Sequence, residues 1–363
     1  MGERIFFHSK SKVKMLYLKF ITLIFVVILE LVSADVTSIS ECPKLAARTS
    51  TAKDVTDLRI DDIQIIAALG DSAMAGFAMM GINSEKKTGM VDTKYVREFR
   101  GSSYVIGGDT DAITLANFIK YYNPNVYGAS TSSHLATLCY GPFCIPPMSL
   151  YNPTIDKLNA AQSGGMAMNL NYELDYLIPR MKAHFLFSKG NFTAWKMITI
   201  QIGSNDQCTS CSNFAAEYAT PEAYGKYVEA AVERIRKEIP NTVVNLLSNY
   251  RVLDIYYRTV NETDYCKASS FIKKKTKCSC FATPETLESL NHTYNAYNEK
   301  LEAIAAKYPG TPGGTFAVIY NPTSSYWNQM FLKKSSKPSV MAFDPNLKIR
   351  CPTEDDRLPT TTN

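Results

Sequence analysis

Histidine is scarce in this sequence: four occur among 363 residues, and none follows His292. Zinc sites usually include histidine or two well-spaced cysteine pairs, so the cysteines here are weak candidates for a metal site. The chain also lacks a strong excess of either charge. The net charge is +5, and it falls to +2 without the five basic and two acidic residues of 1–34. Nucleic acid and strongly anionic surfaces are therefore not expected as partners.

Long apolar runs are missing as well. The N-terminal run from Phe20 to Leu29 has ten residues between Lys19 and Glu30, whereas a membrane-spanning helix needs roughly 20. A basic region precedes this run, and small residues follow it up to Ala34, which is the pattern of a secretory signal peptide over residues 1–34. We therefore expect a secreted protein, with an uncleaved N-terminal membrane anchor as the alternative.

Nine cysteines all follow residue 34, and in a secreted chain disulfides are the default state. Local bridges are possible between Cys139 and Cys144 and between Cys208 and Cys211. The odd count leaves at least one thiol unpaired within the chain. The remaining cluster comprises Cys266, Cys278 and Cys280. Sequons for N-glycosylation, expected of a glycoprotein, begin at Asn191, Asn261 and Asn291.

Apolar runs alternate with amphipathic stretches along most of the chain. This alternation predicts an α/β fold, a three-layer αβα sandwich of the flavodoxin-like kind with a mainly parallel five-stranded sheet. One domain is expected over residues 58–345, after an irregular segment over 35–57 and before a polar tail over 346–363. The candidate strands are 63–69, 157–161, 197–202, 243–248 and 316–320.

The same short sequence pattern predicts the start of two helices. Thr220 and Thr283 are each followed by proline and glutamate, which predicts a threonine N-cap with proline in the first turn. Apolar residues then recur at intervals of three and four, and the second helix is expected to end at the Lys307-Tyr-Pro-Gly sequence. The tyrosines of both stripes, among them Tyr224 and Tyr297, are expected to face the core.

Polar loops follow two of the predicted strands. Gly70-Asp71-Ser72 comes after the first strand, and Gly203-Ser204-Asn205-Asp206 comes after 197–202. Open parallel sheets place their chemistry at the carboxyl ends of their strands, so these loops are candidate site loops. A serine at a helix start exposes its hydroxyl and leaves its N–H free to donate, although a plain N-cap serine has the same position.

Taken in order, the motifs resemble those of the GDSL or SGNH hydrolases, and specifically the secreted phospholipase B-like branch. The blocks are Gly70-Asp71-Ser72, then Gln162-Ser163-Gly164-Gly165, then Gly203-Ser204-Asn205-Asp206. The resemblance implies that Ser72 is the nucleophile of a lipid esterase. Gly164 and Asn205 would complete an oxyanion hole with the Ser72 N–H. It implies a phospholipid or other lipid ester as substrate, only transient contact with a membrane surface, no nucleic acid, and no cofactor or metal.

The sequence departs from this family at the fourth block, Asp-x-x-His, which supplies the general base. Asp344, Asp355 and Asp356 are present, but none has a histidine three residues on. We expect His184 and His292 to lie on the surface. His134, in the loop after Tyr122, is a weak candidate for a substitute base near the site. Three interpretations therefore stay open: an active esterase, an inactive ester-binding protein, or an alternatively ended product of a phospholipase B gene.

Overall fold

The computed structural model describes residues 36–79, 96–144, 146, 149–188, 192–259, 278–322 and 351–360. The chain divides into two compact units. In the smaller unit, the described residues are 36–45 and 351–353, which hold the short 3-10 helix η1 (Ile39–Glu41) and the Cys42–Cys351 disulfide. Every other element belongs to the larger unit. The predicted signal peptide lies outside the described residues.

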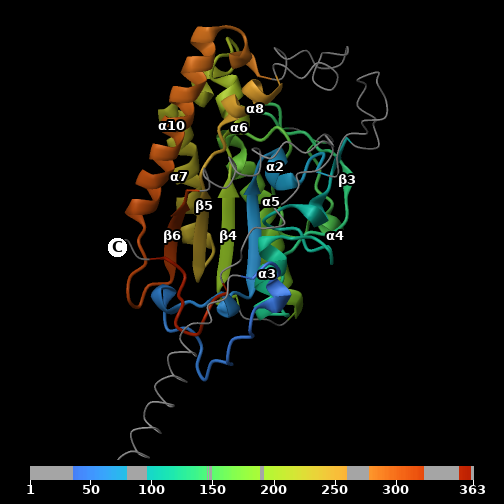
Figure 1. The fold of residues 1–363 in the computed structure, drawn as a ribbon, viewed down its shortest axis with the longest axis vertical. Helices are drawn as coiled ribbons and strands as arrows, with labels where there is room; N and C mark the ends of the chain where they lie inside the picture. Colours follow the sequence, from blue (N-terminus) through green and yellow to red (C-terminus); the bar gives the residue numbers. More distant parts are fainter. Residues whose placement is uncertain are drawn as a thin grey trace, which may run out of the picture. The chain divides into compact units, whose positions relative to one another are not determined.

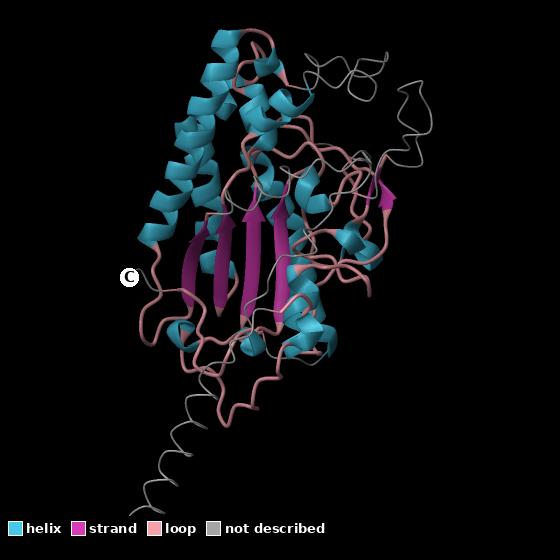
Figure 2. Ribbon diagram, viewed as in Figure 1, coloured by secondary structure: helices cyan, strands magenta, loops and turns pink. Residues whose placement is uncertain are grey.

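A parallel sheet forms the centre of the larger unit, as Figures 1 and 2 show. Its strands have the order β1-β4-β5-β6, and each neighbouring pair is parallel. The predicted α/β fold with a mainly parallel sheet is therefore confirmed. The strands are β1 (Ile65–Gly70), β4 (Lys196–Gln201), β5 (Thr242–Leu247) and β6 (Phe316–Asn321).

Among the described residues the sheet has four strands rather than five, because residues 157–161 form no continuous ladder. This segment contacts β1 through a single bridge, with Ala68 N–H donating to Leu158 O and Ala160 N–H donating to Ala68 O. Earlier along the same edge, Ile66 N–H donates to Tyr127 O instead. Two short segments thus share the outer edge of β1, and neither is long enough to be a strand.

Helices cover both faces of the sheet. Side chains of β1 alternate between two core clusters: Ile65, Ala67 and Leu69 face one side, while Ile66 and Ala68 face the other. The first cluster includes residues of α5 (Leu170–Ser188), α7 (Pro221–Glu238) and α10 (Pro284–Lys307). The second includes residues of α3 (Leu115–Tyr122) and of the turns η2 (Val55–Asp57) and η3 (Ile60–Asp62).

The predicted helix starts are confirmed. The side chain of Thr220 accepts a hydrogen bond from Ala223 N–H, and that of Thr283 accepts one from Thr286 N–H, with proline following each cap. The α10 helix ends at Lys307, as expected. Tyr224 and Tyr297 are fully buried and their rings stack 4.0 Å apart, so these tyrosines fill the core between α7 and α10.

Smaller elements complete the larger unit. The α8 helix is Val252–Thr259. Beside β1, β2 (Arg97–Glu98) pairs antiparallel with β3 (His134–Leu135), and α4 (Pro153–Asp156) follows further along the chain.

The disulfide predictions are partly wrong. The local Cys139–Cys144 bridge is present, but Cys208 pairs with Cys278 and Cys211 with Cys280. Cys208 lies in the last turn of α6 (Ser204–Thr209) and Cys211 follows that helix, and both are paired with Cys278 and with Cys280 of η8 (Ser279–Phe281) rather than with each other. Cys266, left over by the odd count, lies outside the described residues.

Candidate active site

The first site loop turns sharply from β1 into the short helix α2 (Ser72–Ala75). Gly70 has a φ of +154°, and a Cβ there would lie 2.2 Å from Gln201 O, so only glycine fits against β4. Asp71 caps the helix, because its Oδ1 accepts a hydrogen bond from Ala73 N–H at 2.9 Å. Ser72 is therefore the first residue of the helix, with its side chain partly exposed.

The second site loop leaves β4 in the same way. Gly203 has a φ of +132°, and the helix α6 (Ser204–Thr209) starts directly after it. Because β1 and β4 are adjacent and parallel, the two loops emerge side by side, with α2 and α6 near the same strand ends in Figure 1. A hydrogen bond from the Ser204 hydroxyl to Asp71 Oδ2 joins them. Asp71, which precedes Ser72, and Ser204, which precedes Asn205, are thus hydrogen-bonded to each other.

The third loop carries Gly164. Gln162 N–H donates to Gly70 O at 3.0 Å, which fixes this segment against the end of β1. Gly165 N–H donates back to Gln162 O, and Gly164 has a φ of +85°, which are the features of a type II turn with glycine at its third position. Asn205 Nδ2 donates to Gly165 O at 2.9 Å. The structure thus joins the three loops that carry the predicted site residues.

Several N–H groups at this junction can still donate a hydrogen bond to a ligand. A side-chain amide has two N–H groups, and one of those on Asn205 is used on Gly165 O. Ser72 stands in the first turn of α2, where N–H groups have no acceptor within the helix. Among the described residues, the Gly164 N–H donates to no acceptor. These groups are of the kind that stabilises a developing oxyanion.

Three buried carboxyls belong to these loops or contact them. Burial raises the pKa of Asp71, and it raises the pKa of Asp206 to about 7. Burial also raises the pKa of Glu173 well above its usual range, while its Oε2 accepts a hydrogen bond from Gly70 N–H at 2.8 Å. Sequence reasoning missed Glu173. The available signal was one acidic residue between Leu170 and Leu174, on the apolar side of a helix.

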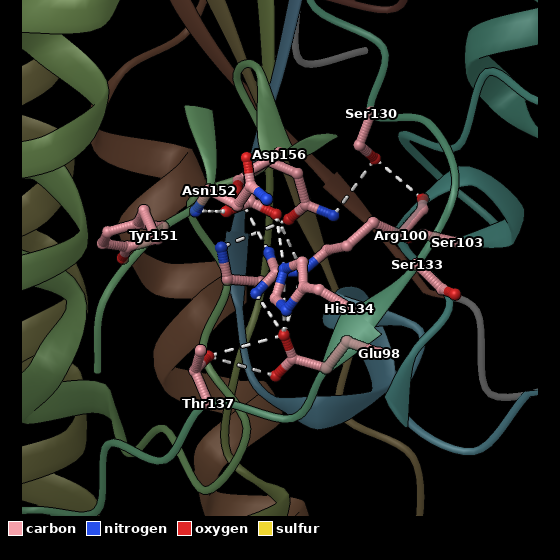
Figure 3. A network of polar contacts seen from close by, with 12 residues as sticks. Glu98, Arg100, Ser103, Ser130, Ser133, His134, Thr137, Tyr151, Asn152 and Asp156 are labelled. Atoms are coloured by element: carbon pink, nitrogen blue, oxygen red, sulfur yellow. Dashed lines mark hydrogen bonds and ion pairs between the residues drawn. The ribbon is translucent and has the colours of Figure 1, made fainter. Parts of the chain in front are cut away.

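His134 belongs to a separate polar network and not to the loop junction (Figure 3). Its Nε2 lies 2.8 Å from Asp156 Oδ1, and its Nδ1 lies 2.7 Å from Leu135 O. Burial lowers the pKa of His134, but the hydrogen bonds to Asp156 and to Leu135 O outweigh burial and leave the pKa raised. Both ring nitrogens are occupied, so in this conformation His134 has none to offer Ser72.

The other two histidines among the described residues lie elsewhere in the fold. His184 is only partly exposed and stacks on Tyr127, with the ring centroids 3.5 Å apart, so the expected surface position holds in part for this residue. His292 is exposed on α10, beside Glu288, as predicted. Asp344 lies outside the described residues.

Residues 66–335 match the family model of the GDSL-like lipase/acylhydrolases. The chain belongs to this family. Relatives include the proteins named "Phospholipase B1, membrane-associated" from rat (31% identity over 247 residues), mouse (28% over 247) and human (29% over 220). The alignments cover 67%, 67% and 59% of this chain. They cover only 15%, 15% and 13% of the relatives, so the chain spans a small part of their length.

Two further features of this GDSL family member concern metal ions and membranes. The described residues contain no group of three or more histidine, cysteine or acidic side chains arranged to hold a metal ion. None of the described helices combines the length and apolar character that crossing a bilayer requires.

Proposed function

We propose that this chain is a secreted lipid esterase of phospholipase B type, acting on acyl esters of phospholipids or lysophospholipids. The observation that carries the proposal is the bonded junction of three loops, in which Ser204 meets Asp71, Asn205 meets Gly165 and Gln162 meets Gly70. In the proposed reaction, the Ser72 hydroxyl attacks the ester carbonyl and the alcohol leaves. Water then hydrolyses the acyl-serine.

The oxyanion of this reaction would accept hydrogen bonds from the N–H groups of Ser72 and Gly164 and from the second amide N–H of Asn205. Losing one such donor typically costs about 3–4 kcal/mol of barrier. A lipid acyl chain is supported by apolar side chains close by. A Cβ at Gly164 would lie 2.9 Å from Leu138, which is 48% exposed, and the exposed rings of Phe143 and Phe214 stack on each other.

The test is release of fatty acid from lysophosphatidylcholine by the chain purified from a secreting host, compared with Ser72→Ala. Fatty acid release by the wild type alone supports the proposal, and equal rates for the two proteins refute it. A fluorophosphonate probe that labels Ser72 in the wild type measures the reactivity of the nucleophile directly. Amino-terminal sequencing of the secreted product checks the expected cleavage before Asp35.

A second candidate function is binding of lipid esters without turnover. It is favoured because no histidine follows His292 and because His134 is held by Asp156. Without its base, a serine triad loses on the order of 10⁶ in turnover, leaving roughly 10³–10⁴ over water. An ether analogue of lysophosphatidylcholine that binds tightly, with no ester cleavage, would support this function.

Added imidazole separates the two functions further, since a small base can accept the serine proton where the protein supplies none. If the three donors are in place and only the base is absent, millimolar imidazole should accelerate ester cleavage by the wild type more than by Ser72→Ala. Equal acceleration of both proteins would refute a preformed oxyanion site.

Glycosylation is also part of the proposal. Asn291 lies inside α10, where its Oδ1 accepts a hydrogen bond from Arg251 Nε at 2.9 Å. A glycan on Asn291 would displace this hydrogen bond, so we expect the Asn291 sequon to stay unmodified; Asn191 and Asn261 lie outside the described residues. Mass spectrometry of the secreted chain after glycosidase treatment tests this assignment.

A further inference from the structure

A buried charged network lies beside the candidate oxyanion loop. Glu98, Arg100 and Asp156 are fully buried. Arg100 donates to Glu98 Oε2 from Nε at 3.0 Å and from Nη2 at 2.7 Å, and its Nε lies 3.4 Å from Asp156 Oδ1. His134 is the fourth member of this network, through its hydrogen bond with Asp156. Figure 3 shows these four side chains pointing toward one another. Charges are buried at high cost unless they are paired and hydrogen-bonded, as these are.

The network reaches the loop that carries Gly164 through three contacts. Glu98 Oε1 accepts a hydrogen bond from the Ser163 hydroxyl at 2.5 Å. Thr137, whose hydroxyl lies 3.4 Å from both carboxylate oxygens of Glu98, donates to Gln162 Oε1 at 2.9 Å. Arg100 Nη1 donates to Asn159 O at 3.1 Å. Two of these contacts fall on the first two residues of the turn, and the third falls on Asn159, just before it. Glu98 is therefore bonded to the residue directly before Gly164.

Ser163 determines which way the Gly164 N–H points. The Ser163 C=O and the Gly164 N–H belong to the same peptide bond, and in a trans peptide these two groups point in opposite directions. Ser163 O accepts a hydrogen bond from Cys139 N–H at 3.0 Å, so the Gly164 N–H is directed away from Cys139. The hydroxyl of Ser163 is held by Glu98 at the same time. The peptide plane is thus fixed through both the carbonyl and the side chain of Ser163.

We propose that Glu98 is a positioning residue, which acts through Ser163 to hold the Gly164 N–H in the orientation needed to bind an oxyanion. Arg100 holds the Glu98 carboxylate in place with two hydrogen bonds, and Asp156 and His134 complete the network around Arg100. The proposal rests on the proposed esterase function, because it gives the Gly164 N–H a task in that reaction. It assigns His134 a supporting role in this network and not the role of general base.

The sequence provides a direct probe of this amide. Gly164 is the only one of the 18 glycines that follows a serine. A chain labelled with 1-¹³C-serine and ¹⁵N-glycine therefore gives a single serine-to-glycine cross-peak in an HNCO spectrum, which belongs to the Gly164 N–H. Its chemical shift and its exchange with solvent report the orientation and protection of the amide, whether or not the chain turns over an ester.

The experiment compares Glu98→Gln with Ser130→Ala as the matched control. Ser130 is also buried, its hydroxyl donates to Arg100 O at 2.8 Å and accepts a long bond from Asn159 Nδ2 at 3.4 Å, and among the described residues no hydrogen bond joins it to Ser163. We expect Glu98→Gln to shift the Gly164 cross-peak, to speed its exchange and to lower the rate of Ser72 phosphonylation about tenfold. Ser130→Ala should change none of these. An unchanged cross-peak together with an unchanged rate in Glu98→Gln overturns the proposal.

A second variant covers the case in which Glu98→Gln does not fold. Ser163→Ala removes only the link and leaves the charged network intact. It should lower kcat for a soluble ester about tenfold with little change in KM, because the link matters once the oxyanion forms. Wild-type rates for this variant would overturn the proposal. If wild-type Ser72 resists the probe, the proposed esterase function fails, while the cross-peak still decides whether Glu98 orients Gly164.

Discussion

Asp206 provides a quantitative test of the buried carboxyls at the site loops. Its side chain is fully buried, and both of its oxygens accept a hydrogen bond from Ala167 N–H, at 3.0 and 3.1 Å. Burial, with a contribution from Asp71, raises its pKa from 3.8 to about 7. The folded state therefore resists ionisation of this group more than the unfolded state does. Its contribution to stability is fully present below about pH 4 and is lost as the pH rises through about 7.

The magnitude follows from the two pKa values. A shift of about 3 units at about 1.4 kcal/mol per unit corresponds to about 4 kcal/mol, of which about 2–3 kcal/mol falls between pH 5 and pH 8. The asparagine in Asp206→Asn cannot ionise, so this variant does not lose that part of the free energy of unfolding as the pH rises. The assay is guanidinium unfolding of the disulfide-bonded protein at pH 5 and pH 8, with exposed Asp175→Asn as a control. The free energy of unfolding of Asp206→Asn, relative to wild type, should rise by about 2–3 kcal/mol at the higher pH. An unchanged difference would refute the reasoning.

Three further predictions follow from single contacts. Burial raises the pKa of Glu173 well above its usual range, so Glu173→Gln should gain stability relative to wild type as the pH rises above about 4, measured by the same unfolding series. Gly203→Ala places a Cβ 2.0 Å from Asn249 Oδ1 at a φ of +132°, and should lower the free energy of unfolding by about 2–5 kcal/mol. Tyr297→Phe loses the hydrogen bond to Ala219 O and should lower it by about 1–2 kcal/mol, with a melting curve of unchanged shape.

The fold was predictable from the sequence where local signals and burial agree. Threonine followed by proline and glutamate marked the starts of α7 and α10, because cap and first turn are determined within a few residues. The strands were visible as apolar runs because both faces of a parallel sheet are buried. The segment 157–161 is less apolar, with Lys157 and Asn159 among its five residues; it shares the edge of β1 with Tyr127 and forms a single bridge. Two segments pair with the same edge of β1, and this is a tertiary effect that the local sequence pattern does not show.

The cysteine pairing and the charged network could not be predicted from the sequence, because both also depend on tertiary contacts. The spacing of Cys208 and Cys211 permits a local bridge, and only the position of η8 decides otherwise. In the same way, Glu98 and Asp156 are far apart in sequence and become partners of Arg100 only when β2, β3 and α4 meet. The sequence motifs marked the residues proposed for the chemistry, and the tertiary structure added the residues that hold them.

These observations separate the two halves of a serine esterase. The proposed oxyanion half is held by contacts that need no histidine: Ser204 to Asp71, Asn205 to Gly165, and Glu98 to Ser163. Asp71 is already engaged by both Ser204 and Ala73 and is fully buried, so it does not replace a base beside Ser72. The loop junction can therefore persist whether or not a base is present. The two proposed functions share one structure and differ only in the acceptor of the Ser72 proton.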